Sequence, residues 1–123
     1  MSNKYRGTRE YLVAYAELIT AARYSGTTTY QAVAEIMDLP PTGSHMGKEV
    51  GQMLNAISVE EASQNRPMLT AIVVGVDGFP GPGFYGLARE LGRLTEKSPE
   101  AEREFWEQEK RAVYDTWART FKS

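Results

Sequence analysis

The sequence contains no cysteine and only one histidine, His45. Disulfide bonds, thiolate chemistry and cysteine-ligated zinc are therefore excluded for this chain. No apolar run approaches the length of about 18 residues that a membrane-spanning helix requires, so we expect no membrane segment and a cytoplasmic location. The chain also lacks a strong charge of one sign. Its formal net charge is -2, which argues against a nonspecific polycationic nucleic-acid binder.

The composition that is present is that of an ordinary globular protein. Hydrophobic residues make up 41% of the 123 positions and charged residues 24%. A chain of this length can bury a substantial core without disulfides or a metal. We therefore expect one domain that covers residues 1–123, with a C-terminal helical extension.

Hydrophobic residues recur at helical spacing over most of the chain, which predicts a mostly helical fold. The expected helices cover residues 8–24, 30–39, 45–57, 58–65, 84–94 and 99–121. Ser44 is expected to cap the third helix, and capping boxes are expected to open the second at Thr28 and the fourth at Ser58. Ser98, followed by proline and acidic residues, is a strong start signal for the last helix.

A nearly continuous apolar run at residues 68–76 is the one strong strand signal. Asp77-Gly78 directly after it is typical of a hairpin turn, and a short return strand should follow before the next prolines. The β-branched residues 27–29 can form another short strand. The predicted fold class is therefore α+β and mostly α: a winged-helix-like helix-turn-helix with a small antiparallel sheet and additional C-terminal helices.

The third predicted helix has the polar face that a DNA-reading helix needs. Lysine suits phosphate or guanine, and glutamine or asparagine can form two hydrogen bonds with adenine. Gly47 and Gly51 each cost about 1 kcal/mol relative to alanine, so a close approach or helix packing should require them. Glu49 argues against close phosphate contact, and a merely solvated face remains the alternative. The expected DNA-contacting residues on and beside this helix are Ser44, His45, Lys48, Gln52 and Asn55.

Short motifs in residues 29–74 follow the order and spacing of a known DNA-binding family. The motifs are Thr29-Tyr30-Gln31, Val33-Ala34, Lys48-Glu49-Val50-Gly51 and Pro67-Met68-Leu69 leading to Ile72-Val73-Val74. With them, the chain resembles the DNA-binding domain of alkylguanine-DNA alkyltransferases and of the alkyltransferase-like proteins. The resemblance covers about a third of the chain, and residues 79–123 have no counterpart in it.

The resemblance implies roles for two residues and the loss of one activity. In the family, the tyrosine helps to rotate a nucleotide out of the duplex, and an arginine before x-Val-Gly fills the vacated space. Tyr30 and Lys48 hold those positions here, although lysine lacks the planar guanidinium that stacks between bases. The reactive Pro-Cys-His-Arg motif is absent from the corresponding stretch near Thr70. The resemblance therefore implies DNA binding without alkyl transfer.

No group of residues in the sequence assembles a reaction centre, so we expect no enzymatic activity, metal or cofactor. Ser44 and His45 are neighbours at a helix start, which is the wrong geometry for a nucleophile and its base. The glutamates of the last helix could bind a metal, but the cations between them favour a solvated, salt-bridged helix. Arg66, just before the predicted strand, is expected to contact phosphate.

The last predicted helix carries a large apolar face. Core packing is the first interpretation of this face, and a homodimer or another protein partner is the second. For the whole molecule we predict duplex DNA as the partner. The alternative is a protein-interaction module, an accessory or inhibitor protein, on the same scaffold. The apolar residues of this face are Phe105, Trp106, Val113, Trp117 and Phe121.

Overall fold

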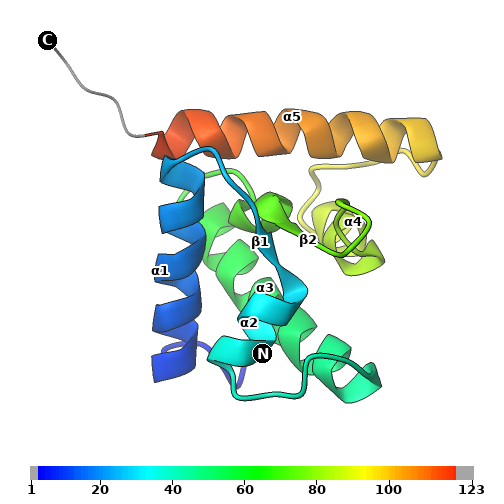
Figure 1. Ribbon diagram of the computed structural model, residues 1–123. Coiled ribbons are helices and arrows are strands. Elements are labelled where there is room, and N and C mark those ends of the chain that lie inside the picture. Colours follow the sequence, from blue (N-terminus) through cyan, green and yellow to red (C-terminus); the bar gives the residue numbers. More distant parts are fainter. Residues whose placement is uncertain (1–2, 119–123) are drawn as a thin grey trace, which may run out of the picture.

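A computed structural model of the protein describes residues 3–118, and it confirms a mostly helical fold with a small sheet (Figure 1). The elements are α1 Arg9–Arg23, β1 Thr28–Thr29, α2 Tyr30–Ile36, α3 Ser44–Ser63, the 3-10 helix η1 Leu69–Ile72, β2 Val73–Val74, α4 Pro82–Glu90 and α5 Pro99–Trp117.

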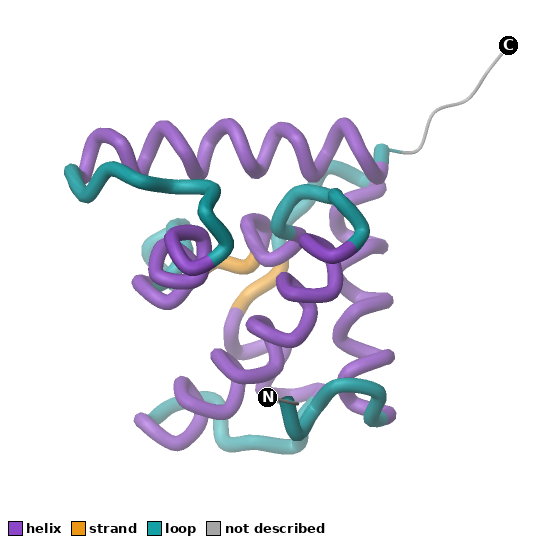
Figure 2. The backbone as a smooth tube through the Cα atoms, turned by 180° about the vertical axis from the view of Figure 1, so that it is seen from behind, coloured by secondary structure: helices purple, strands orange, loops and turns teal. Residues whose placement is uncertain are grey.

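The short helix η1 lies at the centre of the core. All four of its residues are buried. It packs against α1, α3 and α5, and α5 runs across the top of the molecule in Figure 1. Seen from behind, α3 passes diagonally across the body (Figure 2). One apolar cluster therefore joins helices from both ends of the chain.

Two helix starts agree with the sequence, and a third is displaced by one residue. Thr8 caps α1, and Ser98 caps α5 with its hydroxyl oxygen accepting from the backbone N–H of Ala101 at 3.1 Å. The cap of α2 is Thr29, whose hydroxyl oxygen accepts from Ala32 N–H at 3.0 Å. The capping box predicted at Thr28 is wrong, because that residue is buried in β1.

Helix α3 is one continuous helix of 20 residues, where two were predicted. The capping box predicted at Ser58 is wrong, because this side chain is buried and its hydroxyl lies 2.7 Å from the hydroxyl of Thr70 in η1. The start of α3 also differs. Its N-cap is Gly43, with φ of 103°, and Ser44 is the first helical residue without a cap hydrogen bond.

The sheet is parallel, so the predicted antiparallel sheet is wrong. Thr28 pairs with Val73 and Thr29 with Val74. The preceding apolar residues coil into η1, which keeps their backbone groups bonded inside the core. Ala71 N–H donates to Met68 O at 3.0 Å, and the Trp106 indole N–H donates to Ala71 O at 2.8 Å.

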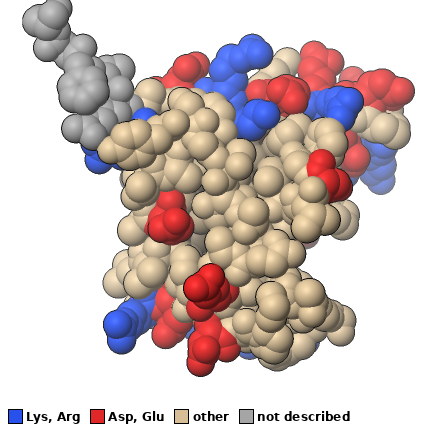
Figure 3. All heavy atoms as spheres, in the orientation of Figure 1, with Lys and Arg blue, Asp and Glu red and all other residues tan. Residues whose placement is uncertain are grey.

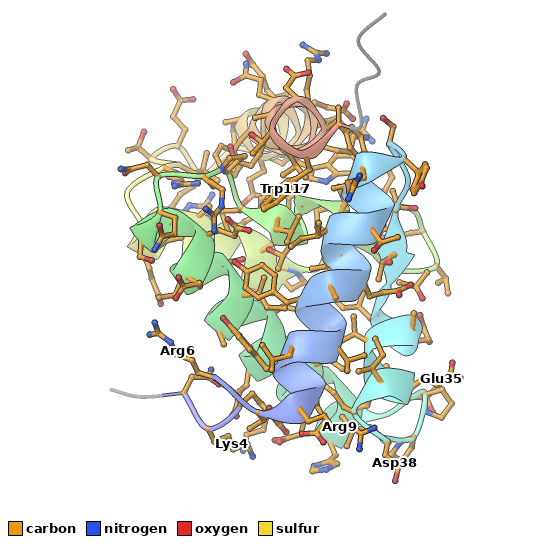
Figure 4. All side chains as sticks on the ribbon, turned by 90° about the vertical axis from the view of Figure 1, so that its left-hand side faces the viewer. Lys4, Arg6, Arg9, Glu35, Asp38 and Trp117 are labelled. Carbon is orange, nitrogen blue, oxygen red and sulfur yellow. The ribbon has the colours of Figure 1, made fainter. Side chains whose placement is uncertain are left out.

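The apolar face of α5 is used inside the molecule. Trp106 and Val113 are buried, and the Phe105 ring lies 5.8 Å from that of Phe84. The Trp117 side chain lies under α5, beside α1 (Figure 4). Phe121 lies outside the described residues. Core packing, the first interpretation of this face, holds for Trp106 and Val113, and a homodimer through the face stays a prediction. None of the helices in residues 3–118 is both long and apolar enough to cross a membrane.

Candidate functional site

The first three turns of α3 present the polar face that was predicted to bind DNA. Ser44, His45, Lys48 and Asn55 are exposed, and Gln52 is half-buried. Figure 1 shows this end of α3 projecting beyond the other helices, at the lower right. Five of the seven predicted contact residues are thus brought together on one free surface.

A pocket of about 690 Å³ opens beside this face. It lies between the start of α2, the first half of α3, the loop after β2 and the start of α4. Its lining is mostly apolar, from residues such as Met46, Leu54, Phe84 and Leu87. Asn55 is common to the polar face and the pocket, so the two form one continuous surface. We refer to this cavity as the α3 pocket. Its polar lining includes Tyr30, Asn55, Thr70 and Asp77.

Two glycines of α3 form one wall of the α3 pocket. A Cβ atom built on Gly47 or Gly51 would meet no atom within 4 Å, leaving out the nearby backbone of α3 itself. Neither residue needs a positive φ. The predicted requirement for a close approach or for helix packing is therefore not met within the described residues. Because these two residues have no side chains, the pocket stays open along this wall.

A tight loop, residues 75–81, forms the opposite wall. Gly75 N–H donates to Phe79 O at 2.9 Å, and Phe79 N–H donates to the Asp77 carboxylate at 3.0 Å. Gly78 has φ of +82°, a conformation that other residues rarely adopt. The predicted hairpin is wrong because the chain turns here and passes through Pro80 into α4 without a paired return strand. Val76, at the tip of the loop, is 96% exposed.

Tyr30 joins this loop to α2. Its hydroxyl oxygen accepts from Gly81 N–H at 2.6 Å. A Cβ on Gly81 would lie 3.1 Å from the same oxygen, so this position favours glycine. Burial raises the pKa of Tyr30 above its usual value, although the hydrogen bond from Gly81 opposes that effect. The side chain predicted to act on a nucleotide is therefore a fixed, neutral part of the pocket wall.

Glu49 is removed from the exposed face of α3 by the N-terminal segment. Its carboxylate pairs with the Lys4 ammonium at 2.6 Å and accepts a short hydrogen bond from the Tyr5 hydroxyl. The hydrogen bonds from Lys4 and then Tyr5 lower the pKa of Glu49, so this residue is a carboxylate at neutral pH. Sequence reasoning missed this arrangement, because no local signal connects residues 4 and 5 to α3.

Arg66 lies outside the candidate site, at the other end of α3. Its guanidinium pairs with the buried carboxylate of Glu61 and stacks over the Trp117 ring at 5.4 Å. Its backbone oxygen accepts from the Arg93 guanidinium at 2.9 Å. Lys48 lies 15 residues before the end of α3, which corresponds to about 22 Å along the helix axis, so Arg66 and Lys48 do not share a surface. Arg66 instead ties α3 to the final helix.

Charged groups are unevenly distributed over the molecule. In Figure 3, Lys and Arg atoms gather along α5 and at one lower corner. On the face that Figure 3 shows, the surface below α5 consists mostly of uncharged residues, with scattered charged groups. Within residues 3–118, no three His, Asp or Glu side chains are grouped so that they could hold a metal ion. The site is thus an apolar pocket beside a polar helix face.

Comparisons of the chain with protein-family models, with curated proteins and with solved structures returned no match.

Proposed function

We propose that this protein is a non-enzymatic DNA-binding protein. In this proposal α2 and α3 act as the helix-turn-helix of a winged-helix-like domain, with the loop 75–81 at the place of the wing. Helix α3 lies against duplex DNA and the α3 pocket accepts one unstacked base. The observation that carries the proposal is the position of this pocket directly beside the exposed polar face of α3.

The polar face of α3 fits a DNA contact in its chemistry. Lys48 supplies a cation for phosphate or guanine, and Asn55 supplies an amide that can bond adenine. The carboxylate that argued against this contact, Glu49, is 6% exposed and already paired with Lys4. Repulsion of phosphate by the first three turns of α3 is correspondingly small.

Some of the residues compared with the alkyltransferase-like proteins lie at the same pocket. Tyr30 and Thr70 line it, and Lys48 follows the wall residue Gly47. A volume of about 690 Å³ is in the range of small-molecule sites and accommodates a nucleobase. In the family the resemblance implies that a rotated nucleotide occupies this region, so the pocket supports the same use here.

The pocket favours binding over chemistry. Its most deeply placed hydroxyl, on Thr70, is bonded to that of Ser58. Among the described residues that line the pocket, the carboxylate of Asp77 accepts from the loop backbone, and none is a histidine. A hydroxyl without a nearby base is a weak nucleophile. We therefore propose no reaction.

A titration with fluorescently labelled duplex DNA, followed by anisotropy at several salt concentrations, tests the proposal. We expect Lys48→Gln to weaken binding and to reduce the slope of log K against log salt by about one, because one phosphate contact is lost. The control is Arg111→Gln, which removes an exposed cation on α5 and should change neither quantity. No binding by the wild-type protein at about 100 μM in low salt would refute the proposal.

A protein partner is the second candidate, and the exposed tip of the loop favours it. Val76 is 96% exposed at the rim of an apolar pocket, with Asp77 as its neighbour. Such a pocket can also take an apolar side chain from another protein. A purified complex that forms without DNA, and that both Val76→Ser and the pocket-narrowing Gly51→Leu abolish, would select this alternative.

A further inference from the structure

The N-terminal segment, residues 3–6, lies along the edge of α3 that faces away from the α3 pocket. The Asn3 amide donates to Gln52 O at 2.8 Å, and Lys4 and Tyr5 both contact Glu49. Successive residues of an α-helix are about 100° apart, so Glu49 lies roughly opposite the pocket wall at Gly47 and Gly51. The exposed polar face of α3 lies between these two edges. Figure 2 shows the segment returning from the start of α1 to α3.

The ion pair between Lys4 and Glu49 is asymmetric. The Lys4 side chain is 58% exposed, whereas that of Glu49 is 8% exposed. The ammonium has three N–H donors. It contacts the Glu49 carboxylate and lies 5.2 Å from the centre of the Tyr5 ring, and its exposure leaves it accessible to a further anion. Glu49 would also keep the hydrogen bond from Tyr5 if Lys4 turned away. The pair can therefore release its cation without leaving the buried carboxylate unbonded.

We propose that Lys4 is a phosphate-contacting residue of the DNA interface, and that Glu49 both places it there and competes with the phosphate for it. This inference rests on the DNA binding proposed above. Lys48 immediately precedes Glu49, and His45 lies one turn before it and acts electrostatically on the same carboxylate. Lys4 thus joins these two residues and extends the polar face of α3 on the side away from the pocket.

Arg6 is a matched control for the phosphate contact proposed for Lys4. This residue lies on the same segment, has the same 58% side-chain exposure, and also pairs with a carboxylate of α3, that of Glu60 at 2.8 Å. Glu60 lies eleven residues beyond Glu49, which corresponds to about 16 Å along the helix axis. Figure 4 shows the two side chains separated at the lower end of the molecule. The two cations thus differ mainly in their distance from the predicted interface.

The test compares Lys4→Gln, Glu49→Gln and Arg6→Gln in the salt-dependent anisotropy titration with full-length protein and duplex DNA. For Lys4→Gln we expect weaker binding, and a loss of affinity between 50 and 200 mM salt that is smaller than that of the wild type by a factor of about 3.5. For Glu49→Gln we expect tighter binding, because the phosphate no longer competes with a carboxylate. Arg6→Gln should bind and respond to salt like the wild type.

Thermal unfolding of the three variants separates folding from binding, because affinities are compared only at temperatures where each variant is folded. Equal losses of DNA affinity for Lys4→Gln and Arg6→Gln would overturn the inference, since both losses would then follow from the change in net charge alone. Weaker binding by Glu49→Gln would refute the proposal that Glu49 competes with the phosphate for Lys4. Wild-type protein that does not bind DNA at all would refute the proposed function itself, which is a separate result from these two.

Discussion

At the scale of single residues, several polar side chains are paired with groups from other segments of the chain. Glu49 and Glu61 both lie on α3, and each is paired by a cation from another segment, Lys4 and Arg66 respectively. A buried carboxylate needs a cation or a hydrogen-bond donor beside it, because a charge without either in the core is costly. The same sequence position can therefore look like a surface charge in the sequence and be an internal contact in the structure.

Tyr30 gives a prediction at this scale. The change Tyr30→Phe keeps the ring in the pocket wall but removes the oxygen that accepts from Gly81 N–H. We expect the free energy of unfolding to fall by about 1 kcal/mol, the usual net value of one hydrogen bond. Urea unfolding measures this loss, and faster amide exchange at Gly81 should accompany it.

The companion substitution for Tyr30 is Gly81→Ala, in which the tyrosine hydroxyl is kept but the new Cβ presses against it. It should weaken the same contact. Unchanged stability in both variants would show that the contact does not hold the loop.

At the scale of elements, α3 has good local helix signals, but it also contains two glycines that neither its packing nor its backbone conformation requires. Gly47 and Gly51 face open space and have ordinary helical φ values. Glycine in a helix interior costs about 1 kcal/mol relative to alanine. Glycine at these two positions therefore lowers the stability of α3 and leaves the α3 pocket open.

Substitution at these glycines should therefore separate stability from binding. We expect Gly51→Ala to raise the free energy of unfolding by up to about 1 kcal/mol. Gly51→Leu should narrow the α3 pocket beside the polar face of α3 and remain folded. The measurement for Gly51→Leu is the fluorescence of a duplex containing 2-aminopurine, which increases when that base unstacks.

Wild-type protein should raise this fluorescence and Gly51→Leu should not, while overall duplex binding persists through α3. An equal rise for both proteins would show that the base does not enter the pocket.

The elements themselves were predictable to the extent that their signals are local. The cap at Ser98 and the helical spacing of α1 were sufficient for those helices, because each depends on a few neighbouring residues. Residues 68–76 were predicted to be a strand because they are apolar, yet only Val73–Val74 form one, and Leu69–Ile72 coil into η1. That choice depends on acceptors and donors such as Trp106 and Glu109, which lie about 40 residues later.

In the candidate site, too, some features were predictable from the sequence and others depended on contacts between distant residues. The polar side of α3 followed from helix periodicity, and the residues near Tyr30 and Thr70 were connected through the family resemblance. The pocket could not be predicted, because it depends on where the loop 75–81 packs against Tyr30. The separation of Arg66 from Lys48 could not be predicted either, since it required knowing that α3 continues to Ser63.

At the scale of the whole molecule, several tyrosines are held in their neutral form by burial. Burial is the largest cause of the raised pKa of Tyr15, Tyr30, Tyr85 and Tyr114. In the unfolded chain a tyrosine ionises near its ordinary pKa of about 10. The folded state therefore retains these protons at a pH where the unfolded state has lost them.

The sign of the resulting pH dependence follows directly. Above pH of about 10 the unfolded state binds fewer protons than the folded state, so the free energy of unfolding falls as the pH rises. Urea unfolding at neutral pH and on both sides of that value measures the effect. Tyr85→Phe removes one of these groups and should give a shallower decline. A stability that does not change across this range would contradict the burial of these phenols.

The parallel pairing of β1 with β2 has a consequence for how the molecule moves. Thr28 and Val73 lie side by side, so the chain leaves this point, forms α2 and α3, and returns to it. Two paired residues on each side are too few to persist alone. The pairing of β1 with β2 should therefore open only when the whole segment from Tyr30 to Ile72 loosens. The amides of the two strands and those of α3 should then exchange with solvent as one cooperative unit.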